Sequence, residues 1–256
     1  MNLLNKNEFF LLEEVVKKNF AAKYKDSVLG IFWSILKPLL IMAMFTIIFS
    51  TIFGQRIANF PVYFLSAKCI FDFFNGAVMV SMNSIKGNKT ILKMTNSPKY
   101  IFILGSVFSE FLNFIISLIL LVAVMIVTNA PFYFSVLPVA IIPILSLLIM
   151  VTGLGLMLSI ICVYYTDITH LWSVISLLLM YGSALFYPMS IIPEPYYSYM
   201  ILNPIYWIID QFRSIIYYGF IPQGIYMLNS LLLSSIILVM GLIIFKKYEK
   251  RVIMKF

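Results

Sequence analysis

Lys37 lies in the first apolar stretch of the chain, near its cytoplasmic third, and can extend toward the lipid head groups. Three more charged residues lie within long apolar stretches, where a charge is costly and therefore informative. Lys68 and Asp72 are four residues apart, and Glu110 lies in the next apolar stretch. A charge at the centre of a bilayer costs about 2.5–3.5 kcal/mol on insertion scales. A spacing of four puts Lys68 and Asp72 on one helix face, so they form either a self-contained pair or a polar patch lining a conduit. Glu110 has no local partner, and we expect it to face protein, to meet a lysine from another segment or to lie near an interface.

The sequence contains no residue set typical of catalysis, nucleotide binding or metal binding. Residues 87–90 resemble a phosphate-binding loop only superficially, because the second glycine before the lysine is missing. Both cysteines, Cys69 and Cys162, lie in apolar runs, and His170 is the only histidine. Neither a metal cluster nor a Ser/His/Asp arrangement can be assembled from these residues. We therefore expect a protein that is not itself an enzyme and that binds no cofactor or metal.

The composition indicates a chain whose solvent is mostly lipid. Of its 256 residues, 62% are hydrophobic and 11% are charged, whereas soluble domains carry about 25% charged residues. So little polar surface cannot coat a soluble globule, which excludes a soluble enzyme. The net charge of +8 is concentrated at the ends of apolar runs. This is the positive-inside pattern of membrane proteins, not a nucleic-acid-binding face.

The apolar runs predict an all-α membrane protein with six transmembrane helices, each needing about 20 residues. The expected spans cover residues 28–53, 60–85, 100–128, 136–164, 171–187 and 225–245. Residues 188–224 are too broken by proline for a span and too apolar for a solvated loop. We expect a re-entrant helical hairpin there, because irregular backbone at membrane depth must be shielded. Residues 28–248 then form one transmembrane domain, and residues 249–256 form a cytoplasmic tail.

Residues 1–27 are expected to form a cytoplasmic interfacial segment. They contain no continuous apolar region typical of a signal peptide. Residues 8–20 predict an amphipathic helix with Phe9, Leu12, Val16 and Phe20 on one face. Such a helix is expected to lie in the membrane interface, with an ordinary soluble leader as the alternative.

The distribution of basic residues predicts the topology. Five Lys or Arg residues precede the first span, four lie in residues 86–99 and five follow the last span, whereas only Arg56 and Arg213 fall on the other side. Both termini are therefore expected to be cytoplasmic. The halves 1–128 and 129–256 do not align, which disfavours transporters built from paired repeats.

Three segments, taken in order, resemble the membrane subunit of ABC-2 type exporters of cell-surface polysaccharides, the permeases for O-antigen, teichoic acid and capsule. The first is residues 23–38, with Ser27-Val-Leu-Gly-Ile-Phe-Trp33 and Pro38, and the second is residues 164–170, Tyr-Tyr-Thr-Asp-Ile-Thr-His. The third is residues 186–193, Phe-Tyr-Pro-Met-Ser-Ile-Ile-Pro, followed by Leu202-Asn-Pro204 and Gln211-Phe-Arg213. The chain departs from the family pattern at Thr166, where relatives have arginine. It also departs at residues 67–74, where relatives often have Gly-x-x-x-Trp-x-Phe-Phe.

The resemblance implies a homodimer in a bacterial or archaeal cell membrane, carrying two separate ATP-binding cassette subunits that bind ATP and Mg²⁺. The cargo would be a lipid-linked polysaccharide moved from the cytoplasm to the outer side, with membrane lipid as surroundings. Basic groups at the first span would attract the anionic head group of that lipid. The candidates for this role are Lys23, Lys25, Ser27, Gly30 and Trp33.

Aromatic rings can stack on the apolar faces of sugars, which suggests pore-lining candidates, although helix packing is the alternative for each ring. The pore-lining candidates are Lys68, Phe71, Asp72, Phe73, Phe74, Phe186 and Tyr187. Contact with the ATP-binding subunits is expected at the cytoplasmic side, where the lysines of residues 86–99 can also act simply as positive-inside anchors. The coupling candidates are Glu13, Glu14, Lys86, Lys89, Lys93, Asp167 and His170. The resemblance assigns Asn203, Pro204 and Arg213 to the re-entrant hairpin.

Two other functions remain open. An ABC-2 exporter of drugs or lipids would share the fold, although the motif at residues 27–33 and the Asn-Pro pair favour polysaccharide. An ATP-independent channel or scaffold would have no ATP-binding subunit attached. A membrane-embedded enzyme is disfavoured because no convergent set of polar catalytic residues is present.

Overall fold

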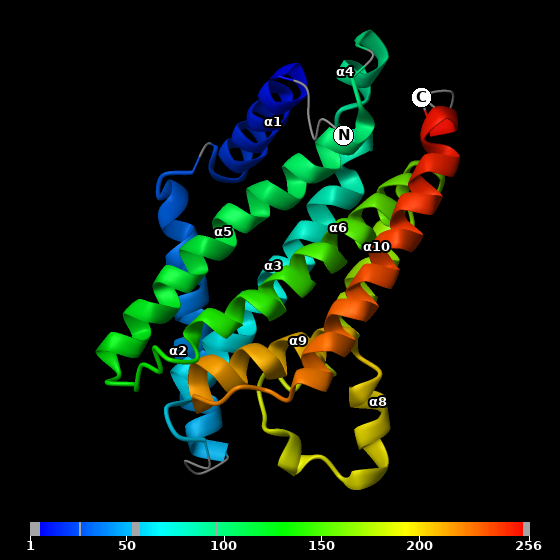
Figure 1. The fold of residues 1–256 in the computed structure, drawn as a ribbon. Coiled ribbons are helices and arrows are strands. Elements are labelled where there is room, and N and C mark those ends of the chain that lie inside the picture. The colour runs from blue at the N-terminus through cyan, green and yellow to red at the C-terminus, as the bar shows by residue number, and fades with distance from the viewer. Residues whose placement is uncertain (1–5, 26, 53–56, 96, 253–256) are drawn as a thin grey trace.

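The computed structural model describes residues 6–25, 27–52, 57–95 and 97–252, and within these ranges the chain forms helices and no strand (Figure 1). The all-α fold class predicted from the sequence is therefore confirmed. The ends of three predicted segments, at residues 1–5, 53 and 253–256, lie outside the described residues.

Five segments of the described chain are long and apolar enough to cross a membrane: Gly30–Phe49, Phe60–Gly87, Lys99–Val127, Leu137–Tyr164 and Gly224–Val252. They correspond to helices α2 (Trp33–Ile52), α3 (Phe60–Gly87), α5 (Lys99–Val127), α6 (Ile141–Tyr164) and α10 (Gly224–Val252). Because the chain as a whole is also apolar, these five segments indicate a multi-pass membrane protein.

The predicted span over residues 171–187 is the one that the structure shortens. Helix α7 (Ile168–Tyr181) has 14 residues, fewer than the roughly 20 that a span needs. It ends because the Asn203 side-chain amide donates hydrogen bonds to the carbonyl oxygens of Leu179 at 3.0 Å and Gly182 at 2.9 Å. These carbonyls are thereby satisfied outside the helix. Six full-length spans are therefore not confirmed.

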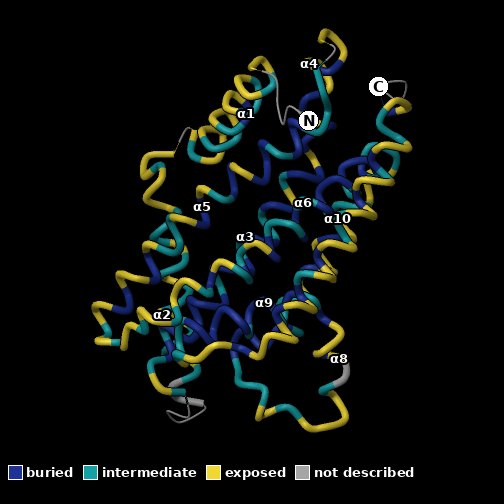
Figure 2. Tube along the Cα trace, viewed as in Figure 1, coloured by how far each residue is buried: buried dark blue, intermediate teal, exposed yellow. Residues whose placement is uncertain are grey.

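Helix α3 forms the centre of the bundle, packed between α5 and α6, and α6 packs along α10 (Figures 1 and 2). The α6–α10 contact is a close backbone approach, because a Cβ atom placed on Gly153 would lie 2.6 Å from the Cα atom of Leu238. Helix α2 is different, because no residue of the apolar segment Gly30–Phe49 is fully buried within the chain. It contacts α3 and α5 at the side of the bundle.

Helix α1 (Lys6–Tyr24) covers the segment in which a helix was predicted, and it packs against α5. Val15 is buried and packs with Leu11 in a small apolar cluster, whereas Phe9 is 60% exposed. The side of α1 that lies against α5 therefore includes Val15, whereas Phe9 and Phe10 are exposed. An interfacial position for α1 remains a prediction.

Residues 188–224 form short helical pieces at the end of the bundle away from the described ends of the chain (Figure 1). These pieces are η3 (Met189–Ile191), η4 (Glu194–Tyr196), α8 (Tyr197–Ile201), α9 (Pro204–Arg213) and the π-turn η5 (Ser214–Tyr218). Helix α9 crosses the bundle and buries one face against α3 and α6. The opposite end carries α1, the short α4 (Lys89–Met94) and the end of α10 (Figure 1).

Candidate functional site

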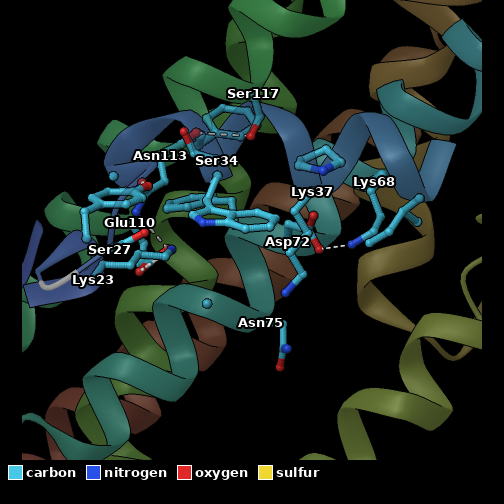
Figure 3. A pocket seen from close by; sticks show the side chains of 18 residues that line it. Lys23, Ser27, Ser34, Lys37, Lys68, Asp72, Asn75, Glu110, Asn113 and Ser117 are labelled. Atoms are coloured by element: carbon cyan, nitrogen blue, oxygen red, sulfur yellow. Dashed lines mark hydrogen bonds and ion pairs between the residues drawn. The ribbon is translucent and has the colours of Figure 1, made fainter. Parts of the chain in front are cut away.

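A cavity of about 390 Å³ lies between the segment that joins α1 to α2 and the helices α3 and α5 (Figure 3). Two groups of residues predicted separately from the sequence meet here. The head-group candidates Lys23, Ser27, Gly30 and Trp33 line it, together with the pore-lining candidates Lys68, Asp72 and Phe73. Lys25 is exposed and is not among the lining residues.

Glu110 is the most deeply buried ionisable group of this cavity, with 6% exposure. The Lys23 ammonium donates to its Oε2 atom at 2.9 Å and to its Oε1 atom at 3.1 Å. A Cβ atom on Gly76 would lie 2.9 Å from Glu110 Oε2, so the glycine makes room for the carboxylate. The expectation that Glu110 meets a lysine from another segment is confirmed. Lys23 therefore neutralises a buried carboxylate from a helix 87 residues away in sequence.

Lys68 and Asp72 form the ion pair that their spacing predicts, and both lie on the wall of the same cavity (Figure 3). The lysine side chain is 14% exposed and the aspartate 43% exposed. The two charges thus neutralise each other, and both side chains also contribute to the polar lining of the cavity.

Helix α1 is held in the register that brings Lys23 to Glu110. It runs in the same direction as α5, since Val15 lies against Gly105 and Asn19 donates to Ser106 at 3.3 Å. The next residue, Tyr24, donates its hydroxyl to Asn113 Oδ1 at 2.5 Å, about one turn beyond Glu110 on α5. The packing of α1 against α5 was not predicted from the sequence. The signal was a polar stripe on α5, formed by Ser106, Ser109, Glu110 and Asn113 at helical spacing, which indicates a polar partner helix.

The remaining aromatic candidates pack inside the bundle. Phe71, Phe74 and Phe186 are each at most 5% exposed, and none lines the cavity. Tyr187 donates its hydroxyl to the carbonyl oxygen of Tyr181. In this chain these side chains fill the packing role that the sequence left open, and Phe73 is the aromatic residue of the set that reaches the cavity.

The seven coupling candidates are exposed and lie on α1, α3, α4, the turn between α6 and α7, and the first turn of α7. Glu13 and Glu14 are not free acceptors, because Lys17 contacts them at 2.7 Å and 3.3 Å. The hydrogen bonds to Glu13 and Glu14 raise the pKa of Lys17 above its usual value.

The Asn-Pro pair and Arg213 are explained by local structure. Asn203 caps α9, since its Oδ1 accepts from the Ile205 amide at 3.1 Å, and Pro204 occupies the first helical position. Arg213 is buried and donates to the carbonyl oxygens of Ala184 at 3.1 Å and Leu185 at 3.3 Å. Both side chains therefore fasten residues 182–185 to α9.

The chain is similar to curated export proteins over nearly its whole length. It is 26% identical over 245 residues to the O-antigen export system permease protein RfbA of Klebsiella pneumoniae, covering 95% of this chain and 93% of that protein. It is 28% identical over 218 residues to RfbA of Myxococcus xanthus, covering 84% and 83%. It is 23% identical over 243 residues to the polysialic acid transport protein KpsM of Escherichia coli, covering 93% of each.

A family profile gives the same placement. The profile described as ABC-2 type transporter matches residues 11–217, which include most of α1, the residues that line the cavity, and α9. Since this match extends over more than half of the sequence, the chain belongs to the ABC-2 type transporter family.

Proposed function

We propose that this chain is the membrane-spanning permease subunit of an ATP-driven exporter that moves a lipid-linked polysaccharide out of the cytoplasm. The observation that carries the proposal is its full-length similarity to permeases named for O-antigen export and to a polysialic acid transport protein. The cavity supports it, because charged and aromatic residues from the helices α1, α2, α3 and α5 line one open space.

The permease works with two ATP-binding cassette subunits, which carry ATP and Mg²⁺, and pairs with a second copy of itself. Helix α2 supports pairing of two permease copies, because no residue of its apolar segment Gly30–Phe49 is fully buried within one chain. The exposed charges of α1, α4 and the α6–α7 turn offer a surface for the ATP-binding subunits. Both termini are then cytoplasmic, residues 28–248 form the transmembrane domain and residues 188–224 form the hairpin on the outer side.

Co-purification tests the assembly. The tagged chain is extracted from its native membrane and the proteins that accompany it are identified by mass. We expect a P-loop subunit in a one-to-one ratio with the permease and chemical cross-links between two permease copies. A chain that is recovered alone, or only with itself, contradicts the ATP-driven function.

Deletion of the gene in the native host tests the cargo. We expect the surface polysaccharide to be lost and its lipid-linked form to accumulate inside the cell, with export restored by the wild-type chain. An unchanged surface polysaccharide, together with increased sensitivity to drugs or altered lipid distribution, would instead identify an exporter of drugs or lipids.

A further inference from the structure

The charges that line the cavity do not balance. Three lysines, Lys23, Lys37 and Lys68, face two carboxylates, Glu110 and Asp72. Lys23 is paired with Glu110 and Lys68 with Asp72. For Lys37, the described part of the chain supplies no ion pair and no hydrogen-bond acceptor. Within these residues, the cavity therefore keeps one uncompensated positive charge.

The position of Lys37 makes this charge unusual. It lies in the apolar segment Gly30–Phe49, which contains no other charged residue. An ionisable group within a spanning segment is costly, and it usually marks a ligand or ion site. Lys68 offsets this cost with a carboxylate one helical turn away, whereas the sequence around Lys37 places no carboxylate at that spacing.

Two further side chains of the cavity wall, Asn75 and Trp33, carry N–H donors that are free within the described residues. Asn75 uses its Oδ1 atom to accept the Trp172 indole N–H at 3.2 Å, which leaves its amide hydrogens without an acceptor among the described residues. Trp33 also lines the cavity, and within the same ranges its indole N–H meets no acceptor. The main amide acceptor on the opposite wall, Asn113 Oδ1, already receives the Tyr24 hydroxyl.

We propose that Lys37, Trp33 and Asn75 form a binding site for a phosphate or pyrophosphate group. A lysine ammonium binds phosphate as a point charge, and N–H donors complete the contacts to an oxygen-rich anion. That the phosphate belongs to a polyprenyl lipid carrier rests on the proposed export function. That the site binds an anion is argued from the residues of the cavity alone. Lys37, rather than Lys23, is then the main residue that binds the lipid head group, because Lys23 already forms an ion pair with Glu110.

Binding of two probes to the purified full-length chain tests the site. Inorganic pyrophosphate and farnesyl pyrophosphate are titrated calorimetrically, in an uncharged glycoside detergent without phosphate. We expect Lys37→Gln to weaken binding about tenfold to a hundredfold, as for loss of a hydrogen bond to a charged group. Lys37→Arg keeps the charge and should bind within about threefold of the wild type. The matched control Lys25→Gln removes an exposed lysine outside the cavity and should leave binding unchanged.

A double variant separates the two lysines. Lys23→Gln alone leaves Glu110 as an unpaired carboxylate that repels the anion, so binding falls. Adding Glu110→Gln removes that repulsion, and binding should return. A double variant that stays as weak as Lys23→Gln would show that Lys23 itself holds the anion and would overturn the proposal. Equal binding by Lys37→Gln and wild type, or no saturable binding of either probe, also overturns it.

The two probes identify the source of the phosphate. Tighter binding of farnesyl pyrophosphate supports a lipid head group, and equal binding of both probes supports a small phosphate anion. The outcome is independent of the deletion experiment above. An unchanged surface polysaccharide after deletion would remove the export function while leaving Lys37-dependent anion binding intact.

Discussion

Arg213 acts as a buried clamp at the end of the molecule that carries α9. It is 4% exposed, and its guanidinium carbon lies 3.8 Å from the centre of the Tyr63 ring. Its two hydrogen bonds reach Ala184 and Leu185, at a turn where Ala184 has a φ of +50°. A non-glycine residue in the left-handed region is strained, so the turn depends on outside contacts. Burial raises the pKa of the neighbouring Asp210, and Arg213 opposes that shift.

Replacing Arg213 by methionine should therefore destabilise the fold. Two carbonyl oxygens lose a charged donor, at about 1.5–3 kcal/mol for each such hydrogen bond. We expect the free energy of unfolding in detergent to fall by about 3 kcal/mol, measured by denaturant titration. Arg251→Met, which removes an exposed arginine near the end of α10, should change it by less than about 0.5 kcal/mol. Equal effects of the two substitutions would contradict the clamp.

Sequence reasoning reached some residues of the site because their signals are local. Lys68 and Asp72 pair at a helical spacing. Asn203 was singled out only by the family resemblance, and its role as the cap of α9 was not predicted. Lys23 and Glu110 form a contact across 87 residues, and no local rule identifies which lysine meets a buried carboxylate. Only the general need of Glu110 for a partner was predictable, because a buried charge must be paired.

At the scale of single helices, the docking of α1 depends on the absence of a side chain at Gly105. A Cβ atom there would lie 2.5 Å from Val15 Cγ1. We expect Gly105→Ala to push α1 away from α5 and to speed protease cleavage within residues 6–25 several-fold. Adding Val15→Ala should restore protection, because it removes the clashing methyl groups. Gly87→Ala, where the new atom meets nothing within 4 Å, is the control and should cleave like the wild type.

The α6–α10 contact is tighter, because it joins backbone to backbone. A Cβ atom on Gly241 would strike the carbonyl group of Gly153, which cannot rotate away. We expect Gly241→Ala to lower the free energy of unfolding by about 1–3 kcal/mol, as overpacking usually does. Gly224→Ala lies on the same helix with open space around it and should have little effect. Equal thermal melting of both variants would show that the helices can separate without cost.

Most of the helices could be predicted from the sequence, whereas their lengths and their packing partners could be predicted less well. Long apolar runs gave α2, α3, α5, α6 and α10, because hydrophobic length is a strong signal. The length of α7 was overestimated because its end is set by Asn203, which lies more than 20 residues later. The packing of α1 against α5, through contacts such as that of Asn19 with Ser106, was not predicted, because the apolar pattern of α1 does not identify its partner helix.

For the whole molecule, the arrangement of lysines predicts its orientation in the membrane. Lys86, Lys89 and Lys93 lie near α1 and the end of α10 at one end of the bundle (Figure 1). We expect single cysteines placed at Lys89 and Lys250 to react with a membrane-impermeant maleimide only after the cells are opened. A cysteine at Asn129, in the turn after α5, should react in intact cells.

The unmodified chain is the control for this labelling, because Cys69 and Cys162 are both buried. Labelling of position 250 in intact cells would mean that residues 168–252 cross the membrane a different number of times. Labelling of position 89 in intact cells would invert the whole topology and remove the surface proposed for the ATP-binding subunits.

The pairing of Lys23 with Glu110 also has a consequence for biogenesis. Ribosomes add about 5–20 residues per second, so the 87 residues between the two positions correspond to a delay of roughly 4–17 s. During that interval α1 has left the ribosome while its docking helix has not been synthesised. The polar face of α1 must then be solvated by water or by lipid head groups. Glu110 is synthesised after Lys23, so its counter-ion already exists when α5 is inserted, and pairing with it lowers the cost of burying the carboxylate.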